Sequence, residues 1–188
     1  DSPFAKLAAA RMEVDLAWDA RSAEYASGVS QVQWHGFAKR LKIARKYLMA
    51  CRELQETEPA WSAVAFTIML GEGADEDEFE DVAEVLFERF SDAEITVAAA
   101  TMHFRPQWGG RPGTWEPWLK RHLSGLAEDK QARAYARIMN SNAGFISAYE
   151  SDAKTLLGEG KVDVALWLKG LELLKSEFPE STWVAAGE

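Results

Sequence analysis

The sequence has only one cysteine and three histidines among its 188 residues. It therefore has few residues with which to form disulfides or transition-metal sites. The single Cys51 excludes an intrachain disulfide. Zinc needs three or four thiolate, imidazole or carboxylate ligands, and no His-x3-His pair or cysteine cluster provides them locally. We therefore expect neither a metal nor another cofactor.

Long apolar runs and nucleotide-binding or hydrolase motifs are missing as well. No stretch approaches the roughly 18–20 apolar residues of a membrane span. Neither the Gly-x4-Gly-Lys-Ser/Thr phosphate loop nor the Gly-x-Ser-x-Gly nucleophile elbow occurs. We expect no membrane partner and, on this basis, a cytoplasmic location.

Positive charge is scarce, with 21 Lys and Arg against 30 Asp and Glu and a formal net charge of −9. An acidic chain is repelled by phosphate backbones, so a nucleic-acid partner is not expected. The only dense basic run is interpreted as a solvated helix face, and it comprises Lys39, Arg40, Lys42, Arg45 and Lys46.

What the chain does have is apolar surface, with 47% hydrophobic residues, recurring every three or four positions. Ser2-Pro3 and Ser30 are typical of helix starts, and no segment alternates apolar and polar residues as a strand does. The predicted helices span about 3–27, 31–51, 61–70, 75–90, 93–104, 118–126, 130–140, 145–157 and 162–178. The predicted breaks are Gly28, Pro59, Gly71-Glu72-Gly73, residues 105–117, Ser141-Asn142-Ala143-Gly144, Gly158-Glu159-Gly160 and Pro179.

Internal repetition indicates how these helices are arranged. Leu70-Gly71-Glu72-Gly73 recurs as Leu157-Gly158-Glu159-Gly160, and a turn former follows nineteen residues later in both copies, at Asp92 and Pro179. Helix pairs that cannot bury their own apolar faces stack on one another. We predict an all-α fold, a short α-solenoid of antiparallel helix pairs. It forms one domain, 1–188, with helical units at about 3–70, 71–104, 118–157 and 158–188 and an irregular loop at about 105–117. Because the chain begins at Asp1, we expect upstream residues to have been removed.

The spacing from Gly160 to Ala165 and the position of Pro179 resemble tetratricopeptide-type (TPR) repeats. The chain departs from that family where the glycine-to-proline distance is two residues too long and where Glu78 replaces a small packing residue. Most of the chain also resembles an uncharacterised bacterial family of TPR-like helical proteins with a Pro-x-Trp-Gly-Gly motif, here Pro106-Gln107-Trp108-Gly109-Gly110, and with an aromatic-Pro turn and a Trp near the end. The resemblance implies a concave helical surface for peptides or partner proteins.

The stretch 102–118 is the one long interruption of the helical pattern, and it holds three of the eight tryptophans. Tryptophan and arginine are the commonest residues at interface hot spots. A binding role is therefore predicted for Arg105, Trp108, Arg111 and Trp115. The alternative is a structural role, in which the tryptophans fold under the loop and act as a wedge between the two halves.

Two functions follow from these observations. The first is a non-enzymatic module that binds a protein or peptide. The second is a hydrolase-like enzyme in which His103 or His122, beside the central loop, meets a carboxylate such as Glu116. Each histidine also has a purely structural or surface interpretation, and Cys51 on an apolar stripe is interpreted as a buried, inert thiol.

Overall fold

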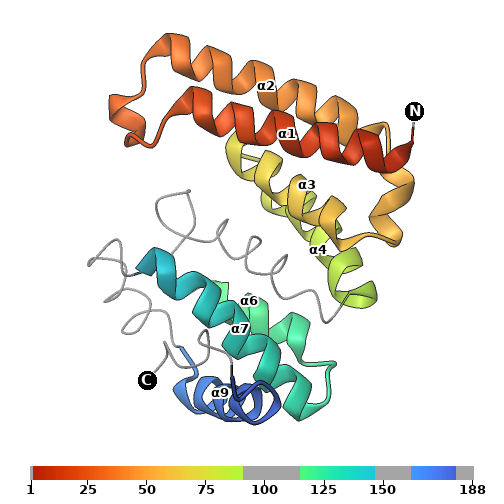
Figure 1. Cartoon of the computed structure of the whole chain (residues 1–188), viewed down its shortest axis with the longest axis vertical. Helices are drawn as coiled ribbons and strands as arrows, with labels where there is room; N and C mark the ends of the chain where they lie inside the picture. The colour runs from red at the N-terminus through yellow and green to blue at the C-terminus, as the bar shows by residue number, and fades with distance from the viewer. Residues whose placement is uncertain (1, 91–114, 147–161, 181–188) are drawn as a thin grey trace. The chain divides into compact units, whose positions relative to one another are not determined.

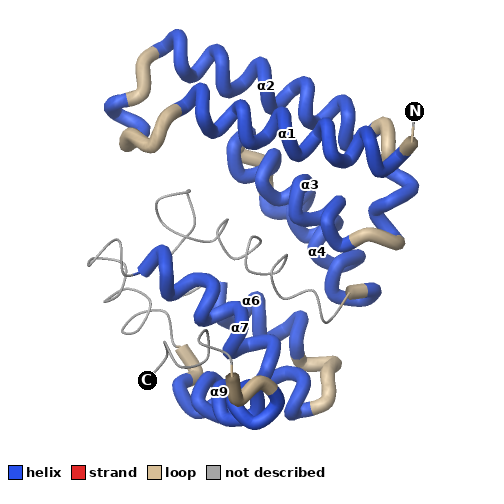
Figure 2. Tube along the Cα trace, in the orientation of Figure 1, coloured by secondary structure: helices blue, strands red, loops and turns tan. Residues whose placement is uncertain are grey.

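The computed structural model describes residues 2–90, 115–146 and 162–180, and all regular structure in these three ranges is helical (Figures 1 and 2). The predicted all-α class is confirmed. The α-helices are α1 (Pro3–Arg21), α2 (Gln31–Met49), α3 (Pro59–Glu72), α4 (Glu76–Arg89), α6 (Trp115–Leu123), α7 (Glu128–Ile146) and α9 (Val164–Glu177). Two short 3-10 helices, η1 (Ala26–Gly28) and η2 (Arg52–Glu56), lie in the connections.

The chain divides into two compact units, Asp1–Arg89 and Phe90–Glu188. Each is described by itself below. The single domain predicted for 1–188, with its four helical units, stays a prediction. The helices predicted at 93–104 and 145–157 and the second glycine turn lie wholly or largely outside the described residues.

The start of α2 shows why the sequence forms a helix there. The Ser30 hydroxyl accepts a hydrogen bond from the Gln33 backbone N–H at 3.4 Å, and the Gln33 side chain accepts one from the Ser30 N–H at 2.9 Å. This capping box satisfies backbone donors that a helix start leaves without intrahelical partners. The predicted cap at Ser30 is confirmed.

α1 begins at Pro3 as predicted but ends at Arg21, six residues before the predicted end. The chain leaves the helix at Ser22, whose φ of 71° lies in the left-handed region. The residues before Gly28 then form η1 instead of continuing α1.

In the N-terminal unit, α1 and α2 lie side by side along their length (Figure 1), and α3 contacts both of them while α4 contacts α3. Much of α3 is enclosed, since Trp61, Val64, Ala65, Phe66, Ile68 and Met69 are all buried. α4 packs through one apolar face, on which Phe79, Val82, Ala83, Leu86 and Phe87 are buried.

Two predicted breaks are misplaced. Pro59 is the first residue of α3 rather than the end of the preceding helix, a position where the missing N–H costs nothing. Gly71 lies inside α3, where a Cβ would come within 2.6 Å of Leu41 Cδ1 and 2.7 Å of the Phe37 ring. Only Gly73, with a φ of 68°, ends the helix in the left-handed conformation typical of glycine.

In the C-terminal unit, α7 contacts both α6 and α9. α6 begins at Trp115, three residues earlier than predicted, with Pro117 in its first turn. α7 continues through the predicted turn at 141–144 to Ile146, so that turn is wrong. Serine, asparagine and glycine each disfavour a helix by only about 0.5–1 kcal/mol, which a helix already formed on its N-terminal side can overcome.

Gly170 lets α7 and α9 pack at close range. A Cβ at Gly170 would lie 2.0 Å from the Ala132 carbonyl oxygen and 2.6 Å from the Ala136 Cβ, so only hydrogen fits there. Ala136 and Leu174 are fully buried, and Trp167 and Leu171 pack against them. The Trp167 indole N–H also donates to the Asn140 side-chain oxygen at 3.1 Å.

Candidate functional site

Of the predicted binding residues, Arg105, Trp108 and Arg111 lie outside the described residues, as does His103. Trp115 is the first residue of α6, and its side chain is likewise outside the described part. The prediction of a binding loop or structural wedge at 105–117 therefore stays a prediction. The described residues show two other features that sequence reasoning did not find.

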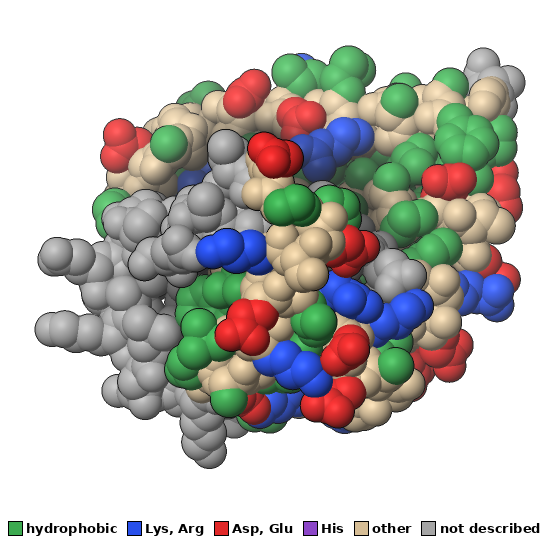
Figure 3. Space-filling view, turned by 60° about the horizontal axis from the view of Figure 1, so that its bottom comes forward, with side chains coloured by type: hydrophobic (Ala, Val, Ile, Leu, Met, Phe, Trp, Pro, Cys, Tyr) green, Lys and Arg blue, Asp and Glu red, His purple; other side chains and the backbone are tan. Residues whose placement is uncertain are grey.

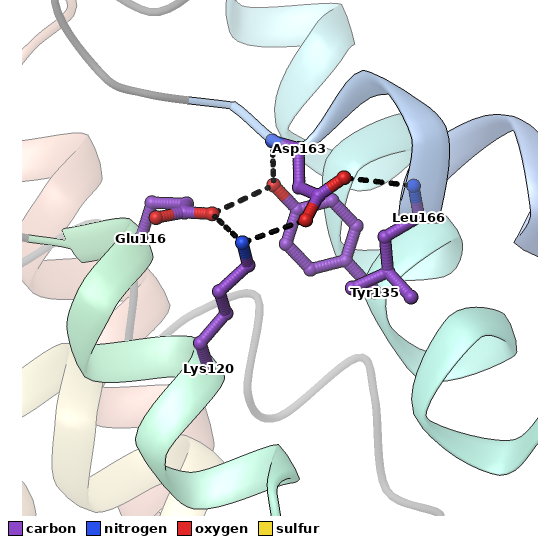
Figure 4. A network of polar contacts seen from close by, with 5 residues as sticks. All are labelled: Glu116, Lys120, Tyr135, Asp163 and Leu166. Atoms are coloured by element: carbon purple, nitrogen blue, oxygen red, sulfur yellow. Dashed lines mark hydrogen bonds and ion pairs between the residues drawn. The ribbon is translucent and has the colours of Figure 1, made fainter. Parts of the chain in front are cut away.

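The first is a polar network in the C-terminal unit that joins α6, α7 and the start of α9 (Figure 4). The Lys120 ammonium lies 2.7 Å from Asp163 Oδ2 and 3.1 Å from Glu116 Oε1. The Tyr135 hydroxyl accepts a hydrogen bond from the Asp163 N–H at 2.9 Å and donates to Glu116 Oε1 at 3.5 Å. Asp163 Oδ1 in turn accepts from the Leu166 N–H at 2.9 Å and caps α9.

Burial and charge explain the protonation states in this network. The Lys120 ammonium, with help from the Leu166 N–H, lowers the pKa of Asp163 below its usual value. The hydrogen bond to Asp163, and a weaker one to Glu116, raises the pKa of Lys120. Burial raises the pKa of Tyr135, which is fully enclosed, so the phenol stays protonated and can act as a donor.

This network holds helices together rather than presenting a reactive group. The partners of the buried Glu116 are Lys120 and Tyr135, and neither is an imidazole. His122 instead packs its ring against Trp118, with ring centroids 4.7 Å apart. The structure thus does not bring together Glu116 and His122, one of the two histidines suggested for a hydrolase-like site, and the other, His103, lies outside the described residues.

The predicted buried thiol is confirmed. Cys51 is fully buried, and its sulfur lies 3.2 Å from the Leu48 carbonyl oxygen. Burial, together with the nearby Glu53 carboxylate, raises the pKa of the thiol, which disfavours the nucleophilic thiolate. His35 is exposed on α2. Across the described ranges, no group of three or more His, Cys, Asp and Glu side chains could hold a metal ion.

The second feature is an apolar stripe on the outer side of α1. We define it by four exposed residues spaced four apart, Phe4, Ala8, Met12 and Leu16. Phe4 and Met12 are each 56% exposed and Leu16 is 37% exposed. Leu7 and Ala17 of the same helix are buried. α1 is apolar on two sides, and α2 and α3 cover one of them.

Arginine–tryptophan stacking occurs in the described residues where α1 meets α2. The Arg21 guanidinium lies 5.6 Å from the Trp18 ring centroid and 5.3 Å from that of Trp34. Phe37 makes edge contacts with both indoles. Such stacking stabilises a helix pair by about 0.5–2 kcal/mol.

Apolar side chains are exposed on other helices as well, such as Val164 and Leu168 on α9. On the face drawn in Figure 3, acidic and basic side chains lie beside one another among hydrophobic ones. No helix in the described part of the chain has the length and apolar character that a bilayer crossing needs. We take the α1 apolar stripe as the candidate binding surface because it sets four exposed apolar side chains in one row.

The chain has no match among models of known protein families, curated proteins or solved structures.

Proposed function

We propose that this chain is a non-enzymatic module that binds a protein or peptide, and that the α1 apolar stripe is part of its binding surface. The observation that carries the proposal is that α1 exposes Phe4, Met12 and Leu16 while its opposite side packs on α2 and α3. Exposed apolar patches on folded proteins are typical of interaction sites.

The geometry of the stripe suits a helical partner. Four residues spaced four apart form one row on a helix, about 18 Å long at 1.5 Å per residue. The charged side chains of Arg11 and Asp15 border this row and pair with each other at 3.1 Å. An amphipathic helix could lay its apolar side on the row and its polar side beside this rim.

A solenoid of TPR-like helix pairs is the architecture we propose for the module. Consecutive helices contact one another from α1 to α4, and α1 also contacts α3, as stacked helix pairs do. The first pair with its connections occupies residues 3–58, well beyond the roughly 34 residues of a TPR. Arg105, Trp108, Arg111 and Trp115 remain proposed binding residues in their own right, independent of the α1 apolar stripe.

A display library of helical peptides tests the proposal with the purified full chain as bait. We expect selected peptides to carry an apolar side, and binding to fall at least about tenfold with Met12→Glu, because a charge would be buried against apolar side chains. Leu16→Glu should act in the same direction.

The matched control is Met49→Glu on α2. Met49 is 48% exposed, close to Met12, but lies outside the stripe, so the same substitution should leave peptide affinity unchanged. Circular dichroism should show that all three variants keep the helical content of the parent. If Met12→Glu and Met49→Glu bind equally well, the stripe is not the binding surface.

A further inference from the structure

The outer side of α2 carries a row of basic side chains that the N-terminal unit does not use. His35, Lys39, Lys42 and Lys46 are all exposed and follow one another at intervals of four, three and four residues. This spacing places them on one side of a helix. They lie opposite the buried residues Phe37, Leu41, Ala44 and Leu48. We refer to these four side chains as the α2 basic row.

α4 carries an acidic row with the same spacing. Asp77, Asp81, Glu84 and Glu88 are exposed and also follow one another at intervals of four, three and four residues. They lie opposite the buried residues Phe79, Val82, Ala83 and Leu86. The two rows therefore have equal length and the same arrangement relative to their own helix core, and the three lysines carry the charge opposite to that of the carboxylates.

Other charges of the same helices are paired inside the unit. Arg40 binds the buried Glu13 at 2.9 Å, and Arg45 reaches Glu72 at 2.7 Å and Glu78 at 2.8 Å. By contrast, none of the eight side chains in the two rows forms a hydrogen bond or ion pair within the part of the chain that the structure describes. The arginines of α2 hold the unit together, whereas its lysines make no such contact within the described residues.

We propose that the chain associates with a second copy of itself through a contact in which the α2 basic row of one copy lies along the α4 acidic row of the other. The identical spacing lets each basic side chain meet one acidic side chain when the two helices lie alongside each other. Contacts of α2 with α2 or of α4 with α4 bring like charges together, so the charge pattern selects one pairing.

The strength of this contact follows from its exposure. Ion pairs on a surface are individually weak, and a net charge of −9 on each copy opposes association. We therefore expect a dissociation constant on the order of 0.1–1 mM at low salt. Added salt at roughly 0.5 M shortens the screening length to a few ångströms and should leave only monomers. This inference does not depend on the proposed function of the α1 apolar stripe.

Sedimentation of the full chain at low and high salt tests the proposal through two triple variants. The first, Lys39→Glu/Lys42→Glu/Lys46→Glu, makes both rows acidic, and the second, Asp81→Lys/Glu84→Lys/Glu88→Lys, makes both rows basic. Each variant alone should lose self-association by about tenfold or more. A mixture of the two should associate again, because the acidic α2 of the first then faces the basic α4 of the second.

A pair of single substitutions distinguishes the effect of the α2 basic row on association from the effect of net charge. Lys42→Glu and Arg52→Glu change the net charge equally, and both remove an exposed basic side chain, but Arg52 lies outside the row on η2. Only Lys42→Glu should weaken association measurably. Circular dichroism establishes that each variant is folded before it is compared.

Three results would overturn the proposal. One is a full chain that stays monomeric at millimolar concentration and low salt. Another is self-association that the two triple variants leave unchanged. The third is a mixture of folded variants that fails to associate although the parent does.

Discussion

Single glycines determine how closely the helices of this protein approach, and two of them give opposite expectations. A Cβ at Gly170 would overlap the Ala132 carbonyl oxygen at 2.0 Å, which forces α7 and α9 apart. We expect Gly170→Ala to lower the free energy of unfolding by about 1–3 kcal/mol, as overpacking does. Chemical denaturation followed by circular dichroism and tryptophan fluorescence measures the change.

Gly36 is the matched control, because it too lies inside a helix that packs on another. A Cβ there would meet the Ala20 Cβ at 3.6 Å, an ordinary contact. Gly36→Ala should therefore raise stability by about 0.5–1 kcal/mol through helix propensity alone. Equal effects of the two substitutions would show that the α7–α9 distance is not limited by Gly170.

A second prediction at the residue scale concerns Asp163 and the pH dependence of stability. Lys120 lowers the pKa of Asp163 below 3.8, so the stability that this carboxylate contributes is present above that pH and is lost as pH falls through the folded-state pKa. Asp163→Asn keeps a good helix cap but removes the charge. It should cost about 1 kcal/mol at neutral pH, a small value because solvent screens the pair.

The same substitution should cost progressively less in acid, since protonation of Asp163 removes the charge from the parent as well. Urea denaturation at neutral pH and at several pH values below 3.8 compares parent and variant. A difference that does not change with pH would mean that Asp163 contributes only its cap to α9.

Residue-level predictions from sequence succeeded where one local environment was enough to decide them. Cys51 lies on a regular apolar stripe with Leu41 and Leu48, and all three are buried. The polar network was missed because Glu116, Lys120, Tyr135 and Asp163 come from three segments far apart in the chain. The available sequence signals were the Glu116–Lys120 spacing of four and an aspartate just before Val164, and neither identifies Tyr135 as their common partner.

At the scale of the helices, two serines at N-caps allow the value of a cap to be measured. Ser30 forms a capping box with Gln33, whereas the Ser2 side chain makes no capping hydrogen bond to α1. We expect Ser30→Ala to cost about 1 kcal/mol and Ser2→Ala to cost clearly less. Thermal unfolding by circular dichroism measures both, and an equal loss would argue against the capping box as the cause.

Helix positions were easier to predict than helix partners. Apolar periodicity located every described α-helix, though not η1 and η2. It could not say which side of α1 would be covered, because that helix is apolar on two sides. Pro59 and Gly71 were misread for a related reason. Proline can end a helix or begin one, and glycine can break a helix or let two helices approach closely. Tertiary contacts decide which of the two roles each residue has.

At the scale of the whole molecule, the division into two compact units predicts that the first can fold alone. Residues 1–89 contain a contiguous core from α1 to α4, and units of this size commonly fold independently. The isolated segment should be helical and unfold cooperatively by circular dichroism. Leu41→Ala in this segment should cost about 2–5 kcal/mol, since Leu41 is almost fully buried.

A segment that is helical but melts without a cooperative transition would contradict that expectation and would favour the single domain predicted from the sequence. The sequence pattern could not separate these possibilities, because the repeat that suggested one continuous solenoid depends in part on Gly158-Glu159-Gly160, outside the described residues.

The charges of α2 and α4 also give the N-terminal unit a permanent electric dipole. α2 has five Lys and Arg and no Asp or Glu, whereas α4 has seven Asp and Glu and one Arg. A protein with a net charge of −9 is retained by a positively charged chromatography resin, but such a resin attracts α4 and repels α2. The molecule should therefore bind in a preferred orientation, and its elution should respond more to a charge removed from α4 than to the same charge change on α2.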